Sequence, residues 1–203
     1  CLDAKTGRVL WSHNLPKEFK TTEDLRGFSS SPLVESNLVI IYIAKSPQIS
    51  VVAFDTTSGR QVWEGLDENP SNTSPIVIEF AGRRQLIVFA YKSVAALDPA
   101  TGRILWRQEI PIWGNYAVPT PVWKDDLLLL SGLMLKLSRD KPGASVLWPD
   151  DLRPLRIYVS DTSTPLLQDG LVFSPTRAGQ LVCLDATTGK QLWQTNGVSE
   201  SNN

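Results

Sequence analysis

Histidine and cysteine are scarce in this chain of 203 residues, which has one histidine, His13, and two cysteines, Cys1 and Cys183. A structural zinc site needs about four closely spaced cysteine or histidine ligands, so the sequence excludes such a cluster. No Gly-x-Ser-x-Gly turn accompanies the histidine, and no glycine-rich loop ends in Gly-Lys-Ser/Thr, so hydrolase and phosphate-binding motifs are absent. Both cysteines occupy the same position of a repeated motif, and we interpret them as small buried side chains rather than as a disulfide.

The chain also lacks an excess of either charge and a long hydrophobic run. Twenty basic and 21 acidic residues are scattered along it, so we expect no nucleic-acid partner. No apolar run approaches the roughly 20 residues of a membrane-spanning helix. No signal-peptide pattern is visible, but Cys1 already lies in a strand pattern. We therefore expect the chain to be a piece of a longer protein, in which case the missing leader says nothing about export.

An internal repeat is the main signal in the sequence. An eleven-residue motif occurs four times, with the pattern small, apolar, Asp, two variable, Thr or Ser, Gly, Arg or Lys, variable, aliphatic, Trp. A worn fifth copy, Lys136 to Trp148, keeps Asp140 and Gly143 roughly in place, and the tryptophans then follow one another at 52, 43, 42 and 45 residues. The recurrent residues are Asp3, Asp55, Asp98 and Asp185; Gly7, Gly59, Gly102 and Gly189; and Trp11, Trp63, Trp106, Trp148 and Trp193.

A second marker keeps the same period. Ser31-Pro32, Ser74-Pro75, Thr120-Pro121 and Thr164-Pro165 are 43, 46 and 44 residues apart, and each opens an apolar run. Proline is tolerated at the first residue of a strand, so the marker predicts the start of the innermost strand of each unit.

Each unit reads as four short strands; in the second unit these are Ile76–Phe80, Gln85–Ala90, Ser93–Leu97 and Ile104–Trp106. Four strands in 40 to 50 residues are typical of a propeller blade. We therefore predict an all-β chain with little helix: a β-propeller arc of about four four-stranded antiparallel blades plus the last hairpin of another, as a fragment of a larger ring. The predicted repeats fill 1–195, with the end of a blade at 1–15, blades at 28–65, 73–108, 118–149 and 160–195, and the next connection starting at 196–203.

The motif residues have structural explanations. An aspartate that starts a turn accepts hydrogen bonds from backbone N–H groups two or three residues later, and glycine supplies the positive φ of the turn. A flat indole buries a large area between neighbouring sheets while its N–H reaches a carbonyl. We therefore expect the recurrent aspartates, glycines and all five tryptophans to hold the blades together. Trp113 and Trp123 lie outside the repeat. We expect them to be buried between loops and the third blade, with a role in stacking on a ligand as the alternative.

The eleven-residue pattern resembles the tryptophan-docking motif of the pyrroloquinoline-quinone-like β-propeller repeat family. That family includes quinoprotein alcohol dehydrogenases, BamB-type outer-membrane assembly scaffolds and many bacterial repeat proteins. The resemblance covers residues 1 to about 195. It implies a ring of six to eight blades, so the remaining blades would have to close the ring.

The resemblance leaves three functions open. A quinoprotein dehydrogenase would bring pyrroloquinoline quinone, calcium, an adjacent cysteine pair and a catalytic aspartate, but no Cys-Cys pair occurs and the recurrent aspartates belong to turns. A sensor domain fused to a kinase or surface module is a further alternative. We favour a non-catalytic scaffold without cofactor or metal, which binds a protein or another extracytoplasmic ligand in the periplasm or at the cell surface.

Loops that lead into the innermost strands are the expected contact surface, because loops carry function more often than the framework does. The candidate contact residues are Arg26, Ser29, Asn72, Asn115, Tyr116 and Asp161.

Overall fold

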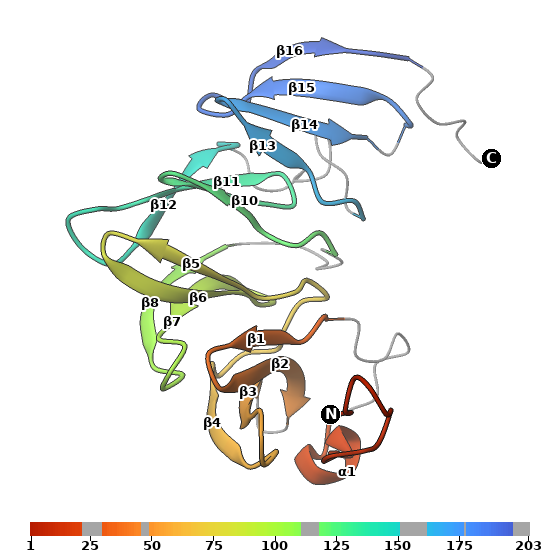
Figure 1. Ribbon diagram of the computed structural model, residues 1–203. Helices are drawn as coiled ribbons and strands as arrows, with labels where there is room; N and C mark the ends of the chain where they lie inside the picture. The colour runs from red at the N-terminus through yellow and green to blue at the C-terminus, as the bar shows by residue number, and fades with distance from the viewer. Residues whose placement is uncertain (22–29, 46–48, 111–117, 151–161, 177, 197–203) are drawn as a thin grey trace.

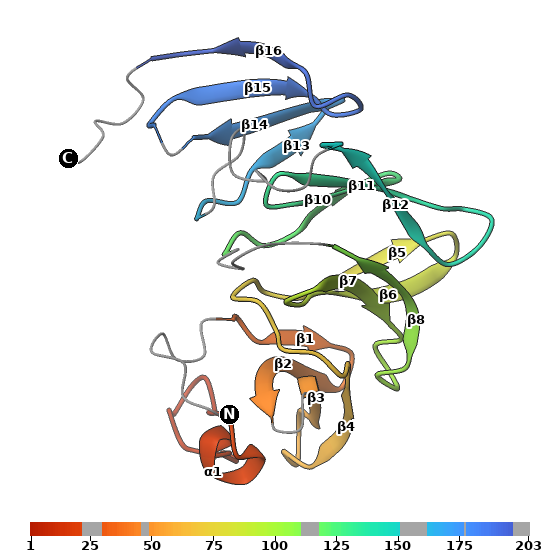
Figure 2. The same ribbon diagram turned by 180° about the vertical axis from the view of Figure 1, so that it is seen from behind.

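The computed structural model describes residues 1–203 except 22–29, 46–48, 111–117, 151–161, 177 and 197–203. It contains four separate sheets, each of four antiparallel strands in chain order. The sheets follow one another as a fan, with the N-terminal segment at one end and the last sheet at the other (Figures 1 and 2). The prediction of an all-β propeller arc is confirmed.

The strand bounds are as follows. The first sheet has β1 (Leu33–Glu35), β2 (Leu38–Lys45), β3 (Ile49–Asp55) and β4 (Gln61–Gly65). The second has β5 (Ile76–Phe80), β6 (Arg83–Phe89), β7 (Ser93–Leu97) and β8 (Ile104–Glu109). The third has β9 (Val122–Lys124), β10 (Leu127–Leu130), β11 (Leu133–Leu137) and β12 (Ala144–Trp148). The fourth has β13 (Leu166–Gln168), β14 (Leu171–Pro175), β15 (Leu181–Asp185) and β16 (Gln191–Gln194).

Every first strand begins directly after the proline of a Ser/Thr-Pro marker, since β1, β5, β9 and β13 start one residue beyond it. The hydroxyl residue of the marker links neighbouring units. The N–H of Ser31 donates to Oγ of Ser74 at 2.9 Å, and the N–H of Thr120 donates to Oγ1 of Thr164 at 3.2 Å. The second period in the sequence thus has a physical basis at two of the three junctions between the described sheets, where the markers of adjacent blades bond to each other.

The hydrophobic cores lie between the sheets rather than within one central core. Strand β7 shows why, because all five of its residues are buried. Ala95 and Leu97 pack towards the first sheet, whereas Val94 and Ala96 pack towards the third. Side chains alternate between the two faces of a strand, so each inner sheet supplies residues to two cores.

A short helix, α1 (Leu15–Phe19), joins the N-terminal motif to the first sheet. The side chain of its N-cap, Asn14, accepts a hydrogen bond from the N–H of Lys17, and Pro16 stands in the first turn, where a missing N–H costs nothing. Phe19 is buried against the edge-to-face ring of Phe54 on β3. Within the described residues, no helix has the length and apolar character needed to cross a membrane.

Candidate functional site

Trp63 closes the junction between the first and second sheets. It is buried on β4, and its Nε1–H donates to the carbonyl oxygen of Pro99 at 3.1 Å. The indole lies so close to Gly102 that a Cβ on this glycine would stand 2.5 Å from indole Cε3. Gly102 also has a φ of +71°. Glycine is therefore needed twice at this position, for its backbone conformation and for the close approach of the indole.

The same geometry recurs at two more junctions. In each, the tryptophan N–H donates to the carbonyl of the fourth residue of the next motif, and the indole covers its seventh residue, the glycine. The hydrogen-bonded pairs are Trp11 with Thr56, at 2.9 Å, and Trp148 with Ala186, at 2.8 Å. The covered glycines are Gly59 and Gly189. Trp148 thus docks like the others although its own repeat is worn.

The first residue of the motif is small because it faces the tryptophan across the hairpin. The register pairs Ala53 with Trp63, Ala96 with Trp106 and Cys183 with Trp193, and each pair is followed by a β-bulge. Cys183 is buried, whereas Cys1 is exposed, and both are free thiols. The interpretation of Cys1 as a buried side chain is therefore wrong. Among the described residues its hairpin forms only an isolated bridge, Leu2 with Val9, and no further strand pairs with it.

The motif aspartates are bound within their own turns. Oδ1 of Asp55 accepts the N–H groups of Thr57, at 3.2 Å, and Ser58, at 2.8 Å, and also the Ser58 hydroxyl. These bonds lower the pKa of Asp55. The side-chain bonds from Thr187 and Thr188, with those from their N–H groups, lower the pKa of Asp185 to about 2. A carboxylate held ionised in this way is a poor proton donor.

The other two motif aspartates lie in similar turns. Asp3 accepts the N–H and the hydroxyl of Thr6, bonds that lower the pKa of Asp3. Asp98 accepts the N–H groups of Ala100, at 2.9 Å, and Thr101, at 3.2 Å. These are the roles that turn chemistry gives to aspartate.

Trp106 departs from the expected pattern. It is buried, but its Nε1–H donates to Oε1 of Gln85 in its own sheet, at 2.7 Å, and not to the next sheet. The reason lies in the worn third repeat. Its turn closes by a bond from the N–H of Ser138 to the carbonyl of Gly143, which lacks the left-handed φ of the motif glycine and faces open space. The turn therefore offers no glycine surface to an indole.

The two ends of the fan are also different from the inner junctions. Trp193 on β16 is 43% exposed, and its ring contacts Phe173 with centroids 6.1 Å apart. At the other end Gly7 has the same φ as the docking glycines, +70°, but nothing lies within 4 Å of its Cβ position. An exposed indole and an uncovered glycine turn thus stand at opposite ends of this chain.

Most of the predicted contact residues lie outside the described residues: Arg26, Ser29, Asn115, Tyr116 and Asp161, and with them Trp113. Asn72 is described and half-buried in the connection from the first to the second sheet. Trp123 is half-buried on β9, packs against the core between the second and third sheets, and donates its Nε1–H to the carbonyl of Asp125 at 2.8 Å.

The connection that carries Asn72 is anchored by a buried polar layer that the sequence pattern does not predict. Glu68 is buried, and its carboxylate accepts the N–H of Lys92 and the hydroxyl of Ser93 in the next sheet. Ser71 and Thr73, on either side of Asn72, are buried and hydrogen-bonded to each other at 2.8 Å. The flanking residues therefore fix the backbone of Asn72. Regular repeats give no signal for such a layer, because its members belong to the irregular connection.

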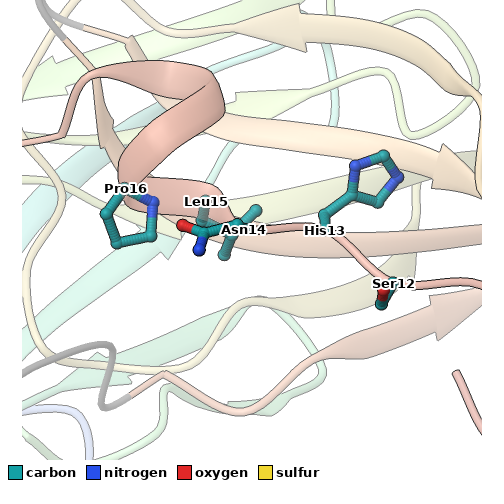
Figure 3. Close-up of a pocket in the computed structure, with 5 residues that line it drawn as sticks. All are labelled: Ser12, His13, Asn14, Leu15 and Pro16. Carbon is teal, nitrogen blue, oxygen red and sulfur yellow. The ribbon is translucent and has the colours of Figure 1, made fainter.

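His13 lies in the connection before α1, where Ser12, His13, Asn14, Leu15 and Pro16 line a hollow of about 460 Å³ (Figure 3). Its ring stacks on Phe54, with centroids 4.4 Å apart. Nδ1 faces Oε2 of Glu18 at 2.6 Å, and Nε2 faces the carbonyl of Gly59 at 2.7 Å. Both partners are acceptors, so an imidazolium satisfies both. Burial lowers the pKa of His13, but the bonds to Glu18 and Gly59 outweigh it, and the pKa is raised.

Within the described part of the chain, no three His, Cys, Asp or Glu side chains gather as metal ligands would.

A family model described as outer membrane protein assembly factor BamB matches residues 1–118 and 137–203. Among curated proteins, a relative from Bordetella pertussis with the same description is 25% identical over 168 residues, which are 83% of this chain and 41% of the relative. The chain therefore spans about two fifths of that relative.

Solved structures show the same fold. BamB from Moraxella catarrhalis superposes with a TM-score of 0.64 and 18% identity over 97% of this chain and 57% of that structure. Quinohemoprotein alcohol dehydrogenase from Comamonas testosteroni gives a TM-score of 0.52 and 15% identity over 83% of this chain and 35% of that structure. At these identities the likeness concerns the fold alone.

Proposed function

This chain belongs to the family described as outer membrane protein assembly factor BamB, and on that premise we propose that it is a non-catalytic propeller scaffold that binds other proteins during outer-membrane assembly. The proposal places it in the periplasm. It takes the loops that lead into the innermost strands as the contact surface, with Arg26, Ser29, Asn72, Asn115, Tyr116 and Asp161 as contacts.

One observation carries the proposal beyond family membership: the recurrent polar residues serve the framework. The motif aspartates bind their own turns, and each docking tryptophan whose N–H is buried donates it to a carbonyl or amide oxygen. A group bound in this way is not free to transfer protons or to attack a substrate. The framework therefore supplies shape and spacing, and the loops supply the chemistry of recognition.

The dehydrogenase alternative predicts a quinone and calcium site, and we propose that this chain contributes to none. The likeness to the alcohol dehydrogenase is one of fold, and fold does not carry chemistry. Titration of the full-length protein with pyrroloquinoline quinone and calcium tests this directly. Saturable quinone binding together with dye-linked oxidation of an alcohol would overturn the scaffold proposal.

The scaffold itself is tested in cells. Deleting the gene should reduce the amount of folded outer-membrane β-barrel protein, measured by heat-modifiable migration in gels, and the intact gene should restore it. A gene with loop substitutions at Asn115, Tyr116 and Asp161 should restore it less well, while the variant protein accumulates to the normal level in the periplasmic fraction. Full restoration by this variant would rule out these loops as the contact surface.

A further inference from the structure

Two departures from the repeat coincide at the junction between the second and third sheets. The first is in the β5–β6 hairpin. In the other three sheets this hairpin closes at the pair formed by the third residue after the marker proline: Glu35 with Leu38, Lys124 with Leu127, and Gln168 with Leu171. In the second sheet the corresponding pair is Ile78 with Gln85, and the hairpin continues through Glu79 with Arg84 and Phe80 with Arg83. It therefore projects further than its counterparts.

The second departure is the worn turn Ser138–Gly143, which faces this projection. The turn receives no indole N–H, and Trp106 donates its N–H to Gln85 instead. Gln85 stands where the other sheets have leucine, at Leu38, Leu127 and Leu171. The glutamine satisfies the buried N–H within its own sheet, which releases the turn from the docking role.

The projecting hairpin and the worn turn enclose a cleft of about 200 Å³. It is lined by Phe80, Ala81, Arg83, Gln85, Ser138, Arg139, Asp140, Lys141 and Pro142. Three of these side chains are cations, Arg83, Arg139 and Lys141, and all three are exposed. None of the three has an ion-pair partner among the residues that the structure describes. The guanidinium of Arg139 lies over the ring of Phe80, 5.1 Å from its centroid.

We propose that this cleft binds an acidic segment of a partner protein by seating an Asp or Glu side chain between its cations. The planar guanidinium of arginine matches a carboxylate, and charge-assisted hydrogen bonds of this kind are stronger than neutral ones. The cleft is smaller than the roughly 300–1,000 Å³ typical of cofactor pockets, so it suits one or two side chains of a peptide. Asp140 in the lining disfavours a doubly charged phosphate and can accept a backbone N–H beside the bound carboxylate.

The test uses the full-length protein and a fluorescein-labelled, end-capped peptide of alternating Glu and Leu, followed by anisotropy. The probe should bind saturably, and added salt should weaken it. Replacing two cations that do not hold the fold, Arg83→Ala with Lys141→Ala, should weaken binding at least about tenfold, because two charge-assisted bonds are lost. The matched control removes two exposed cations from regular motif turns, Arg103→Ala with Lys190→Ala, and should leave the affinity unchanged.

Two results would contradict binding of an acidic segment in this cleft. Equal binding of a peptide with Gln in place of Glu, or equal loss in both double variants, would overturn the proposal. A third arm uses vesicles of phosphatidylcholine with phosphatidylglycerol: if the cleft variant loses vesicle binding but not peptide binding, the surface is a membrane site. The proposal adds a partner chemistry to the scaffold function but can fail separately. If the wild-type protein binds no acidic peptide while the cleft variant restores β-barrel assembly in cells, this proposal fails and the scaffold proposal stands.

Discussion

Gly102 lies beneath the indole of Trp63, at a distance that leaves no room for a methyl group between them. Gly7 has the same left-handed conformation and the same place in its motif but has open space around it. The two glycines therefore separate the cost of conformation from the cost of packing.

We predict that Gly102→Ala destabilises the protein more than Gly7→Ala. Both alanines adopt a left-handed φ, at a cost of about 1–2 kcal/mol. At position 102 the new methyl also pushes the indole away, which adds about 1–3 kcal/mol of overpacking. Urea unfolding followed by tryptophan fluorescence measures both changes. Equal losses for the two variants would show that the indole adjusts without cost.

The motif tryptophans should differ in how much each contributes to the free energy of unfolding, according to how deeply each is buried. We expect Trp106→Ala and Trp148→Ala each to lower the free energy of unfolding by about 3–5 kcal/mol, as deletions of buried aromatic side chains do. Trp193→Ala should cost clearly less, because this ring is 43% exposed. Thermal unfolding of the three variants in parallel checks the order. A loss at Trp193 as large as that at Trp148 would contradict it.

Gln85→Leu should be destabilising even though leucine occupies this position in the other sheets. The substitution leaves the buried N–H of Trp106 without an acceptor, which costs about 1–3 kcal/mol. In a Trp106→Phe background, which has no N–H, the same change should cost little. A double-mutant cycle on unfolding free energies measures this coupling, and additive effects would refute the hydrogen bond as the reason for the glutamine.

The hydrogen bonds of His13 to Glu18 and to the carbonyl of Gly59 predict that the stability of the protein depends on pH. The pKa of His13 is raised above its ordinary 6.5 in the folded protein, so its contribution to stability is complete below 6.5 and is lost as the pH rises through the folded value. The pKa of Glu18 is lowered by its bonds to His13 and Asn14, so its contribution is lost at acid pH, below its ordinary 4.5. The ion pair between His13 and Glu18 should therefore stabilise the protein most between pH 4.5 and pH 6.5.

The measurement compares unfolding free energies of the wild type and His13→Phe from pH 5 to pH 8. The aromatic substitute can keep the stack on Phe54, and the gap between the two proteins should narrow as the pH rises. Glu18→Gln serves as the control, because it removes the carboxylate that raises the pKa of His13 and should shift the change to lower pH. If the unfolding free energies of the wild type and His13→Phe changed with pH in parallel, the ion pair between His13 and Glu18 would not stabilise the fold.

The repeat predicts the fold from sequence because the same contacts recur at most of the junctions. The Asp turn, the positive φ of Gly59 and the indole between sheets each follow from one residue type at one spacing. Trp148 could be placed from its spacing alone, although its repeat is worn. Two packing roles could not be predicted: that the motif glycine also makes room for an indole, and that the first motif residue is small because it faces the tryptophan across the hairpin. Both depend on which strand or turn the indole faces.

The exceptions to the repeat could not be predicted from the sequence. Trp106 has an intact motif, and its changed partner follows from a defect in the next repeat together with Gln85, in a different strand. The worn turn and the glutamine at a leucine position were a signal for it, but only strand register connects them. The loop contacts could not be derived from the period, since irregular connections such as the one around Glu68 do not repeat.

Strand β7 and its counterparts place alternate side chains in the two cores on either side of their sheet. When one sheet unfolds, its neighbour therefore loses the packing on one of its two faces. Unfolding of one blade would expose the apolar surfaces of both adjacent blades to water. Unfolding should therefore propagate along the fan from one blade to the next, as in other linear repeat arrays. The junction without a cross-sheet indole bond is held chiefly by apolar contact, which has no preferred direction. Small changes in the angle between blades should therefore cost least there.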